Sequence, residues 1–201
     1  MKKAFTLILS LLLLSSALMA MRPRFSYGLE WGYTGTFLNT WQENYIYSSG
    51  SRIVDNSGVW RYFSNGSLLA CAGLDLTEKL NLSLYSGIHG VYFKRRMVPL
   101  ELRARWCPSG LEGNGLVTCL GAAAMFPTAA IYSVSPRINA GAGYRVNVYK
   151  SICVDFLLSF AVSGDHRSII DPDTSTPVPE EDITRNTAQY WGISFSVALN
   201  F

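Results

Sequence analysis

The last fourteen residues of the chain alternate between two kinds of side chain. Segment 188–201 reads AQYWGISFSVALNF. Large apolar side chains fill every second position from Trp191 to Phe201, and most positions between them are small or polar. Because successive side chains of a β-strand point to opposite faces, this period of two predicts a strand with one apolar and one polar face. Any fold that contains the segment must supply a different environment for each face.

Seven earlier segments alternate in the same way. They are 25–37, 60–76, 80–92, 98–106, 116–126, 137–148 and 152–162. Short connections follow the second, fourth and sixth segments, at 77–79, 107–115 and 149–151, and long connections follow the first and seventh, at 38–59 and 163–187. An even number of strands, with short turns at one end and longer loops at the other, is typical of an up-and-down β-barrel.

The N-terminal residues have the pattern of a secretory signal peptide. Lys2 and Lys3 precede the apolar run 4–14, and small residues continue to Ala20. This pattern predicts a signal peptide over 1–20 and a single barrel domain over 21–201, with an uncleaved membrane anchor as the alternative. Loss of the two lysines lowers the net charge from +3 to +1. A nearly neutral chain gives no reason to expect a nucleic acid partner.

The distribution of lysine indicates which face of the strands points inward. A soluble eight-stranded barrel with an apolar interior would show the same alternation. After residue 20, however, lysine occurs only at Lys79, Lys94 and Lys150, all within predicted turns. A sheet face in contact with water would carry more of them. We therefore expect an all-β fold, an eight-stranded antiparallel up-and-down transmembrane β-barrel with a polar interior, and a secreted soluble β-fold as the alternative.

The predicted interior carries balanced charges. The expected lumen charge network comprises Glu30, Asp75, His89, Glu101, Arg103, Arg105, Arg137, Arg145 and Asp155. A hairpin centred on Lys150 places Arg145 opposite Asp155, and a turn near residue 95 places His89 opposite Glu101. Buried charges must be paired, so we expect a salt-bridged plug, with a narrow solute path as the alternative. An acid/base role for His89 and Glu101 would lack access for a substrate.

Four cysteines also fall at positions that face the predicted interior: Cys71, Cys107, Cys119 and Cys153. Cys107 and Cys119 flank one hairpin connection, so they are a candidate disulfide in an oxidising compartment. Four small buried thiols that fill space are the alternative. The cysteine spacings match no zinc motif, and we expect neither a metal nor a cofactor.

Two segments and the final residue resemble a known family. Residues 97–106 read MVPLELRARW, residues 138–148 read INAGAGYRVNV, and the chain ends at Phe201. This combination resembles the small "porin family" outer-membrane β-barrel domain of Gram-negative bacteria. The resemblance implies the outer membrane as the location, with the termini in the periplasm and outer-membrane lipid around a monomeric barrel. It also implies that Phe201 is the assembly signal read by the barrel-assembly machinery.

The resemblance leaves the function open, since many members of the family lack a demonstrated activity. We expect a non-catalytic protein of envelope structure or surface-loop interaction, with Trp41, Tyr45 and Tyr47 in the first long loop. A narrow small-solute channel is the alternative.

The last long connection raises two further hypotheses. A lipid A-modifying acyl hydrolase would draw on the run His166-Arg167-Ser168 with Glu180 or Glu181, although the serine lies in a proline-rich loop instead of a strand. A calcium site would draw on Asp171, Asp173, Ser175 and Asp182, although Thr176 stands where such a loop needs glycine. We expect a solvated acidic loop and no catalytic residue.

Overall fold

The computed structural model describes residues 24–92, 95–128, 134–166 and 169–201. The predicted signal peptide over 1–20 lies outside these residues. The described elements are β1 (Arg24–Ile46), β2 (Arg52–Asp75), β3 (Leu80–Tyr92), β4 (Arg95–Trp106), β5 (Gly115–Pro127), β6 (Ser135–Tyr149), β7 (Ile152–Asp165), the 3₁₀ turn η1 (Glu180–Asp182) and β8 (Ile183–Asn200).

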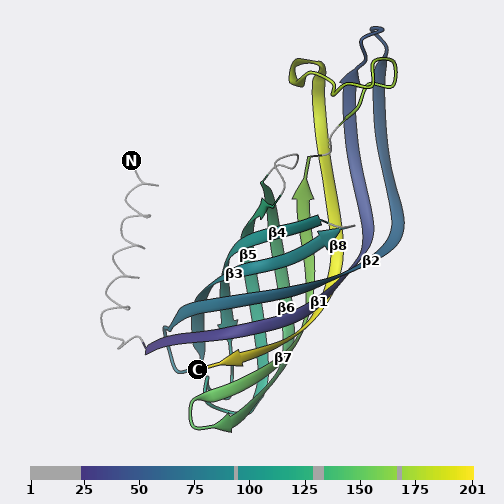
Figure 1. Ribbon diagram of the computed structural model, residues 1–201. Coiled ribbons are helices and arrows are strands. Elements are labelled where there is room, and N and C mark those ends of the chain that lie inside the picture. Colours follow the sequence, from purple (N-terminus) through teal and green to yellow (C-terminus); the bar gives the residue numbers. More distant parts are fainter. Residues whose placement is uncertain (1–23, 93–94, 129–133, 167–168) are drawn as a thin grey trace, which may run out of the picture.

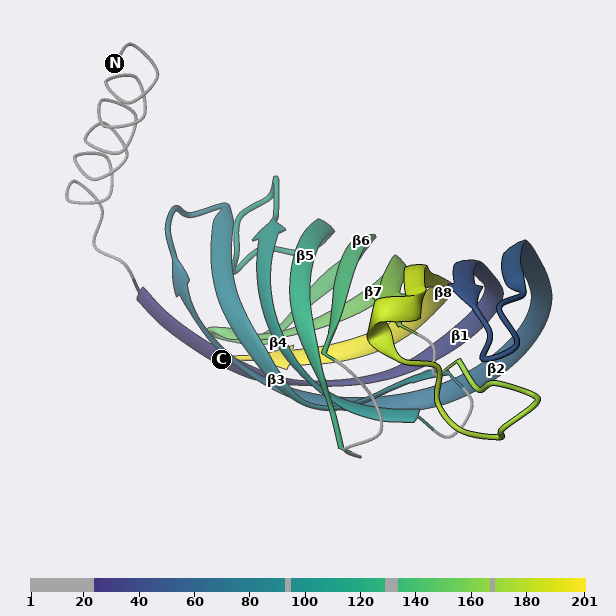
Figure 2. The same ribbon diagram turned by 90° about the horizontal axis from the view of Figure 1, so that it is seen from above.

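The eight strands close into one antiparallel barrel (Figures 1 and 2). Each strand pairs with its neighbours in sequence, and β1 also pairs with β8 from Gly28↔Asn200 upward. The predicted all-β, up-and-down topology is therefore confirmed. Within the described ranges, no helix has the length and apolarity needed to span a bilayer. We call the end of the barrel near Arg24 and Phe201 the base, and the opposite end the top.

The wall of the barrel has its apolar side outward. In β1, Glu30 is buried, whereas Leu29 and Trp31 are 54% and 65% exposed. The same contrast holds around the ring, where Leu68, Ile88, Leu102, Leu120, Ile138, Leu158 and Phe195 are all exposed. We call this exposed apolar zone the belt. The polar face of the strands therefore lines the interior, as the lysine distribution predicted.

Several predicted strand ends are wrong: β8 begins at Ile183 instead of 188, β4 begins at Arg95 instead of 98, and 38–59 is not a long loop. β1 and β2 continue through this region as a hairpin that turns at Tyr47–Ser51, where the Tyr47 and Gly50 amides donate to the Ser51 and Tyr47 carbonyls. Trp41 and Tyr45 consequently lie in β1 and only Tyr47 lies in the turn. The pairing register shifts between Thr36 and Leu38, and this bulge reverses the phase of the alternation.

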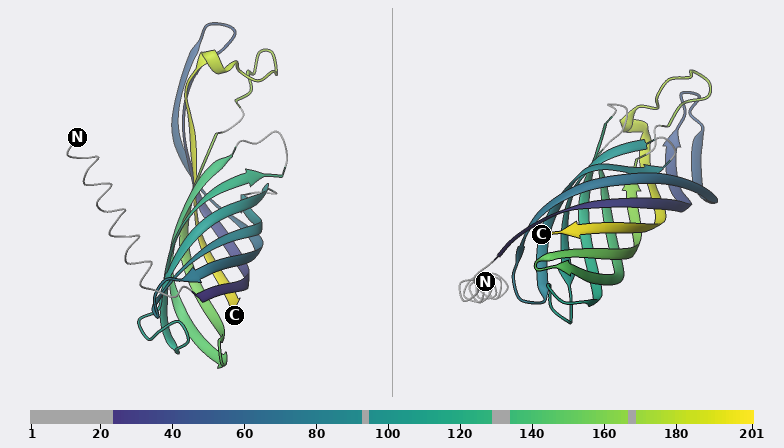
Figure 3. Two further views of the ribbon diagram at one scale, coloured as in Figure 1. Left: turned by 90° about the vertical axis from the view of Figure 1, so that its left-hand side faces the viewer. Right: turned by 60° about the horizontal axis from the view of Figure 1, so that its bottom comes forward.

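The upper parts of β1, β2 and β8 extend well beyond the other five strands (Figure 1, and Figure 3, left). β3 pairs with β2 only from Ser67 toward the base, and β7 pairs with β8 only up to Asp165↔Ala188. We call the sheet of residues 38–46, 52–60 and 183–191 the protrusion; most of it lies above these limits, and only 188–191 still pair with β7. Near its tip Tyr45 packs with Ile169 and Val178 of the last connection. The protrusion therefore has a small apolar core of its own.

The close approach of β6 to β7 generates a stability prediction. A Cβ atom placed on Gly143 would lie 1.8 Å from the Phe156 carbonyl oxygen, whereas one placed on Gly66 would meet nothing nearer than 4.0 Å. We expect Gly143→Ala to destabilise the barrel by about 1–3 kcal/mol, as overpacking does, and Gly66→Ala to leave its stability almost unchanged. Urea unfolding in detergent micelles measures both. Equal unfolding midpoints would contradict this packing.

Candidate functional site

The layer of the lumen nearest the base is organised around Asp155, which is completely buried. Its carboxylate accepts hydrogen bonds from Arg145 Nε and Nη2 at 2.6 Å each, from Arg105 Nη1 at 3.3 Å and from Asn200 Nδ2 at 3.0 Å. Arg145 lies directly across from Asp155 in the β6–β7 register, as predicted. One carboxylate thus serves two guanidinium groups, one of them in a bidentate pair.

Asp75 is connected to this layer through the side-chain amide of Asn81. Its Oδ1 accepts from Asn81 Nδ2 at 2.7 Å, and Asn81 Oδ1 accepts from Arg105 Nη2 at 3.1 Å. Asp75 itself is half-buried at the base. Asn81 and Asn200 were not among the predicted network residues. Their inward positions in the alternation were the available signal.

The middle layer is centred on Arg103. Its Nη1 lies 2.6 Å from Glu30 Oε2 and its Nε lies 2.6 Å from Glu101 Oε1, so one guanidinium joins β1 to β4. Its carbon Cζ also lies 4.0 Å from the centre of the Tyr85 ring, which is fully buried. The ring faces a cation that has lost its water, the setting in which a cation–π contact is strongest.

The predicted pairing of His89 with Glu101 is wrong. Tyr85 lies opposite Glu101 and His89 lies opposite Met97, because the β3–β4 hairpin is centred two residues earlier than the prediction assumed. His89 Nε2 instead lies 2.6 Å from Arg137 Nη1. Since a guanidinium only donates hydrogen bonds, Nε2 is the acceptor and the ring is neutral with its proton on Nδ1. His89 and Glu101 therefore do not form the hypothesised acid/base pair.

A third layer near the top was not predicted. Arg95 forms a buried ion pair with Asp165, which also accepts from Ser135 Oγ at 3.2 Å and from the Tyr190 hydroxyl at 3.3 Å. An apolar cluster of Val91, Met97, Met125 and Tyr190 packs beside it. Arg95 was expected in a turn and Asp165 in a loop. Both residues occupy the alternate positions at which β4 and β7 point side chains inward. Extending the alternation to these positions could have identified them from the sequence.

All four cysteines are buried free thiols, and no bond joins Cys107 to Cys119. The last pair of the β4–β5 ladder is Trp106↔Thr118. Cys107 therefore aligns with Val117 and lies diagonal to Cys119. The two thiols share a small apolar cluster with Val117 and Leu157, so they fill space at the base.

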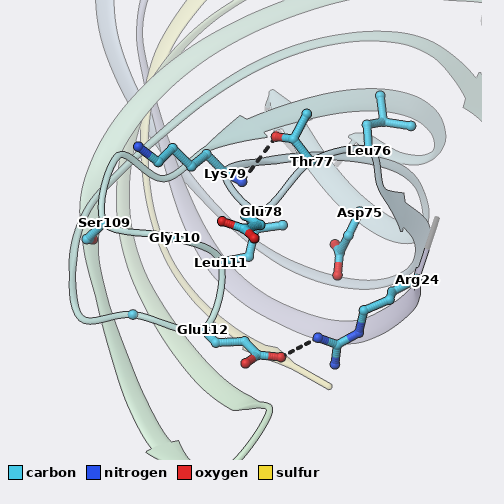
Figure 4. Close-up of a pocket in the computed structure, with 11 residues that line it drawn as sticks. Arg24, Asp75, Leu76, Thr77, Glu78, Lys79, Ser109, Gly110, Leu111 and Glu112 are labelled. Carbon is cyan, nitrogen blue, oxygen red and sulfur yellow. Dashed lines mark hydrogen bonds and ion pairs between the residues drawn. The ribbon is translucent and has the colours of Figure 1, made fainter. Parts of the chain in front are cut away.

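Separate cavities lie at the base and near the top of the barrel. The larger has a volume of about 790 Å³ and lies between the β2–β3 turn and the loop at Ser109–Gly113, where Arg24 Nη1 and Glu112 Oε1 are 2.5 Å apart (Figure 4). A second cavity of about 430 Å³ reaches upward to Arg105 and Arg145. Near the top, the cavity that Arg95 lines has a volume of only about 10 Å³. The middle layer at Arg103 lies between the cavities at the base and the space near Arg95.

The last connection shows neither hypothesised arrangement. Asp171 accepts from the Ser48 and Asp173 amides at 3.0 and 2.8 Å, and the Ser48 hydrogen bond lowers the pKa of Asp171. Among the described residues, no group of three metal-ligating side chains lies together. His166 Nδ1 lies 2.5 Å from the Asn186 carbonyl oxygen, and Ser168 lies outside the described residues.

Phe201 is held against the first strand. Its ring stacks on Tyr27 with the centroids 5.2 Å apart, and the two residues exchange backbone hydrogen bonds of 2.8 and 3.2 Å. The terminal aromatic residue therefore extends the β1–β8 closure to the base. Its role in assembly stays a prediction.

No protein-family model and no curated protein matches the chain. The similar solved structures include two outer membrane proteins. The outer membrane protein OprG from Pseudomonas aeruginosa aligns with 88% of this chain and 95% of its own, at 10% identity and a TM-score of 0.47. The outer membrane protein AlkL, solved in DMPC bilayers, aligns with 86% of this chain and 90% of its own, at 11% identity and a TM-score of 0.39. The "porin family" resemblance stays a prediction.

The shared carboxylate of the lowest layer generates the second prediction. Asp155→Asn leaves Arg105 and Arg145 without a buried counter-charge, and removing one partner of a buried ion pair costs about 3–5 kcal/mol. We expect the urea midpoint of the barrel to fall accordingly. The matched control is Glu112→Gln, which breaks the exposed ion pair with Arg24 and is expected to leave the midpoint unchanged. A midpoint that is the same in both variants would contradict the network.

Proposed function

We propose that this chain is an integral protein of a Gram-negative outer membrane, without catalytic activity and with a lumen plugged by charges. The observation that carries the proposal is the reversed polarity of the wall, with large apolar side chains exposed and arginines and carboxylates buried. Only a closed barrel lets strands cross hydrocarbon with every backbone group paired, and the β1–β8 ladder provides that closure.

Aromatic side chains at both edges of the belt support this placement. Exposed aromatic residues lie near the base at Phe25, Tyr27, Trp106, Tyr144 and Tyr149, and near the top at Trp60, Tyr62 and Phe126. Such girdles are typical of the two membrane interfaces. With the termini in the periplasm, as the family resemblance implies, the protrusion stands on the outer surface. Outer-membrane lipid and, during assembly, the barrel-assembly machinery are then the expected partners of a monomer.

The filled lumen supports the non-catalytic role. The ion pairs at Asp155, Arg103 and Arg95 are buried and fill successive levels of the lumen with charged side chains that already have partners. His166, the candidate base of an acyl hydrolase, contacts a backbone carbonyl. The role that fits is a rigid membrane anchor that presents the protrusion and the loop at its tip.

Heat-modifiability tests the membrane placement. We expect the protein in an outer-membrane fraction to run as a compact band when it is unboiled in SDS and to shift after boiling, because the closed barrel resists the detergent until heated. A protein that is found in the soluble periplasmic fraction and never shifts would overturn the proposal.

Conductance in a planar bilayer tests the plug separately. We expect no stable current steps from the inserted protein, because the layers at Asp155, Arg103 and Arg95 block the lumen. The heat shift of the same preparation serves as the control for folding. Reproducible steps from protein with the shifted band would favour the channel instead.

A further inference from the structure

The outward face of the protrusion changes character directly above the belt. Across β8, β1 and β2 the strand register aligns the outward side chains in rows. The lowest row is apolar and consists of Trp191, Leu38 and Trp60. The rows above it are Gln189, Thr40 and Gly58, then Thr187, Gln42 and Asn56, then Arg185, Asn44 and Val54. Side chains that can hydrogen-bond therefore begin one row above two tryptophans.

These polar rows enclose a groove with a volume of about 540 Å³. Its lining residues are Thr40, Trp41, Gln42, Asn56, Ser57, Gly58, Arg185, Thr187 and Gln189. Gly58 keeps the groove deep, because a side chain at position 58 would lie between the Asn56 amide and the Trp60 ring, which are the neighbouring outward side chains of β2. The groove opens to the outside of the sheet, away from the charged lumen.

The groove offers many hydrogen-bonding groups that the protein does not use. Within the described ranges, the side chains of Gln42, Asn56 and Gln189 make no hydrogen bond or ion pair to another residue. The indole Nε1 of Trp191, in the row below, is buried and has no partner among the described residues. Planar amides and hydroxyls that lie side by side suit a ligand with many hydroxyl groups, since each amide both donates and accepts.

One wall of the groove is a free sheet edge. Among the residues that the structure describes, β2 has a ladder partner only on its β1 side from Arg52 to Gly66, because the β2–β3 ladder begins at Ser67. Alternate residues of this stretch therefore present their backbone N–H and C=O groups outward. These groups add donors and acceptors beside Asn56. Arg185 at the opposite side supplies one positive charge for an anionic substituent.

We propose that this groove binds the saccharide headgroup of an outer-leaflet glycolipid, with lipopolysaccharide as the ligand class. The inference rests on the proposed membrane placement, which puts the groove at the height where acyl chains end and sugars begin. Trp60 and Trp191 lie at that boundary, the amides of Gln42, Asn56 and Gln189 hydrogen-bond the sugar hydroxyls, and Arg185 pairs with a phosphate or carboxylate of the headgroup. The glycolipid would then hold the protrusion upright on the membrane.

Binding of deacylated lipopolysaccharide saccharide to the purified protein in detergent micelles tests the proposal by calorimetry. The variant Gln42→Ala/Gln189→Ala removes two amides, and Gly58→Tyr fills the groove without removing a hydrogen bond. The control Thr118→Ala changes a half-buried outward residue of β5, far from the groove, whose hydroxyl donates to the Trp106 carbonyl. We expect the double variant to bind at least about tenfold more weakly than wild type, which corresponds to the loss of two ordinary hydrogen bonds. Gly58→Tyr is expected to weaken binding by a similar factor because the ring occupies the groove, and the control is expected to bind like wild type.

A heat shift recorded on each preparation separates failure of this site from failure of the membrane placement. Saccharide binding that is equal in wild type and both groove variants would overturn the site. So would a folded wild type that binds no saccharide, or one that binds phosphatidylglycerol vesicles as well as intact lipopolysaccharide. A wild type that instead associates with a second copy through the free β2 edge would also overturn it. Loss of the heat shift in wild type would overturn the membrane placement itself.

Discussion

The structure depends on closure of the backbone hydrogen-bond network by β1 and β8. An apolar outer wall excludes water, so each strand must find a partner on both sides over the height of the belt. The ladder from Gly28↔Asn200 and the backbone exchange between Tyr27 and Phe201 provide the last of these partners. Closure with eight strands leaves an interior just wide enough for side chains. Everything polar that points inward must therefore be satisfied by other side chains.

The interior meets this demand by sharing charges between strands. Asp155 bridges Arg105 and Arg145, and Arg103 bridges Glu30 and Glu101. Arg137 donates a hydrogen bond to His89, whose neutral ring accepts it at Nε2. Because Asp155 and Arg103 each have two charged partners, removing either side chain leaves charges buried without a partner. The network thus couples the stability of the barrel wall to the closure of its lumen.

The lysine distribution was needed to predict that the polar face points inward, whereas the period of two was enough to predict the strands and their number. It also predicted the pairing of Arg145 with Asp155, because the short turn around Lys150 leaves little freedom in register. It could not place His89, since residues 93–96 read FKRR and contain no glycine, asparagine or proline to locate the turn. It also missed the long hairpin of β1 and β2, because the bulge near Phe37 reverses the phase of the alternation.

That bulge joins two opposite environments within the same three strands. Below it, β1 exposes Leu29 and Trp31 and buries Glu30. Above it, β1 turns Thr40 and Gln42 outward and packs Tyr45 against Ile169 and Val178 on the inner side. β2 and β8 keep one phase of alternation throughout, and their outward residues change from apolar Leu68 and Phe195 to polar Asn56 and Thr187 along the strand. In β1 the bulge is also needed, because it puts Thr40 and Gln42 on the outward face. Each face of the sheet thus suits hydrocarbon over part of its length and water over the rest. The protrusion can therefore grow directly from the barrel wall with no separate domain or linker.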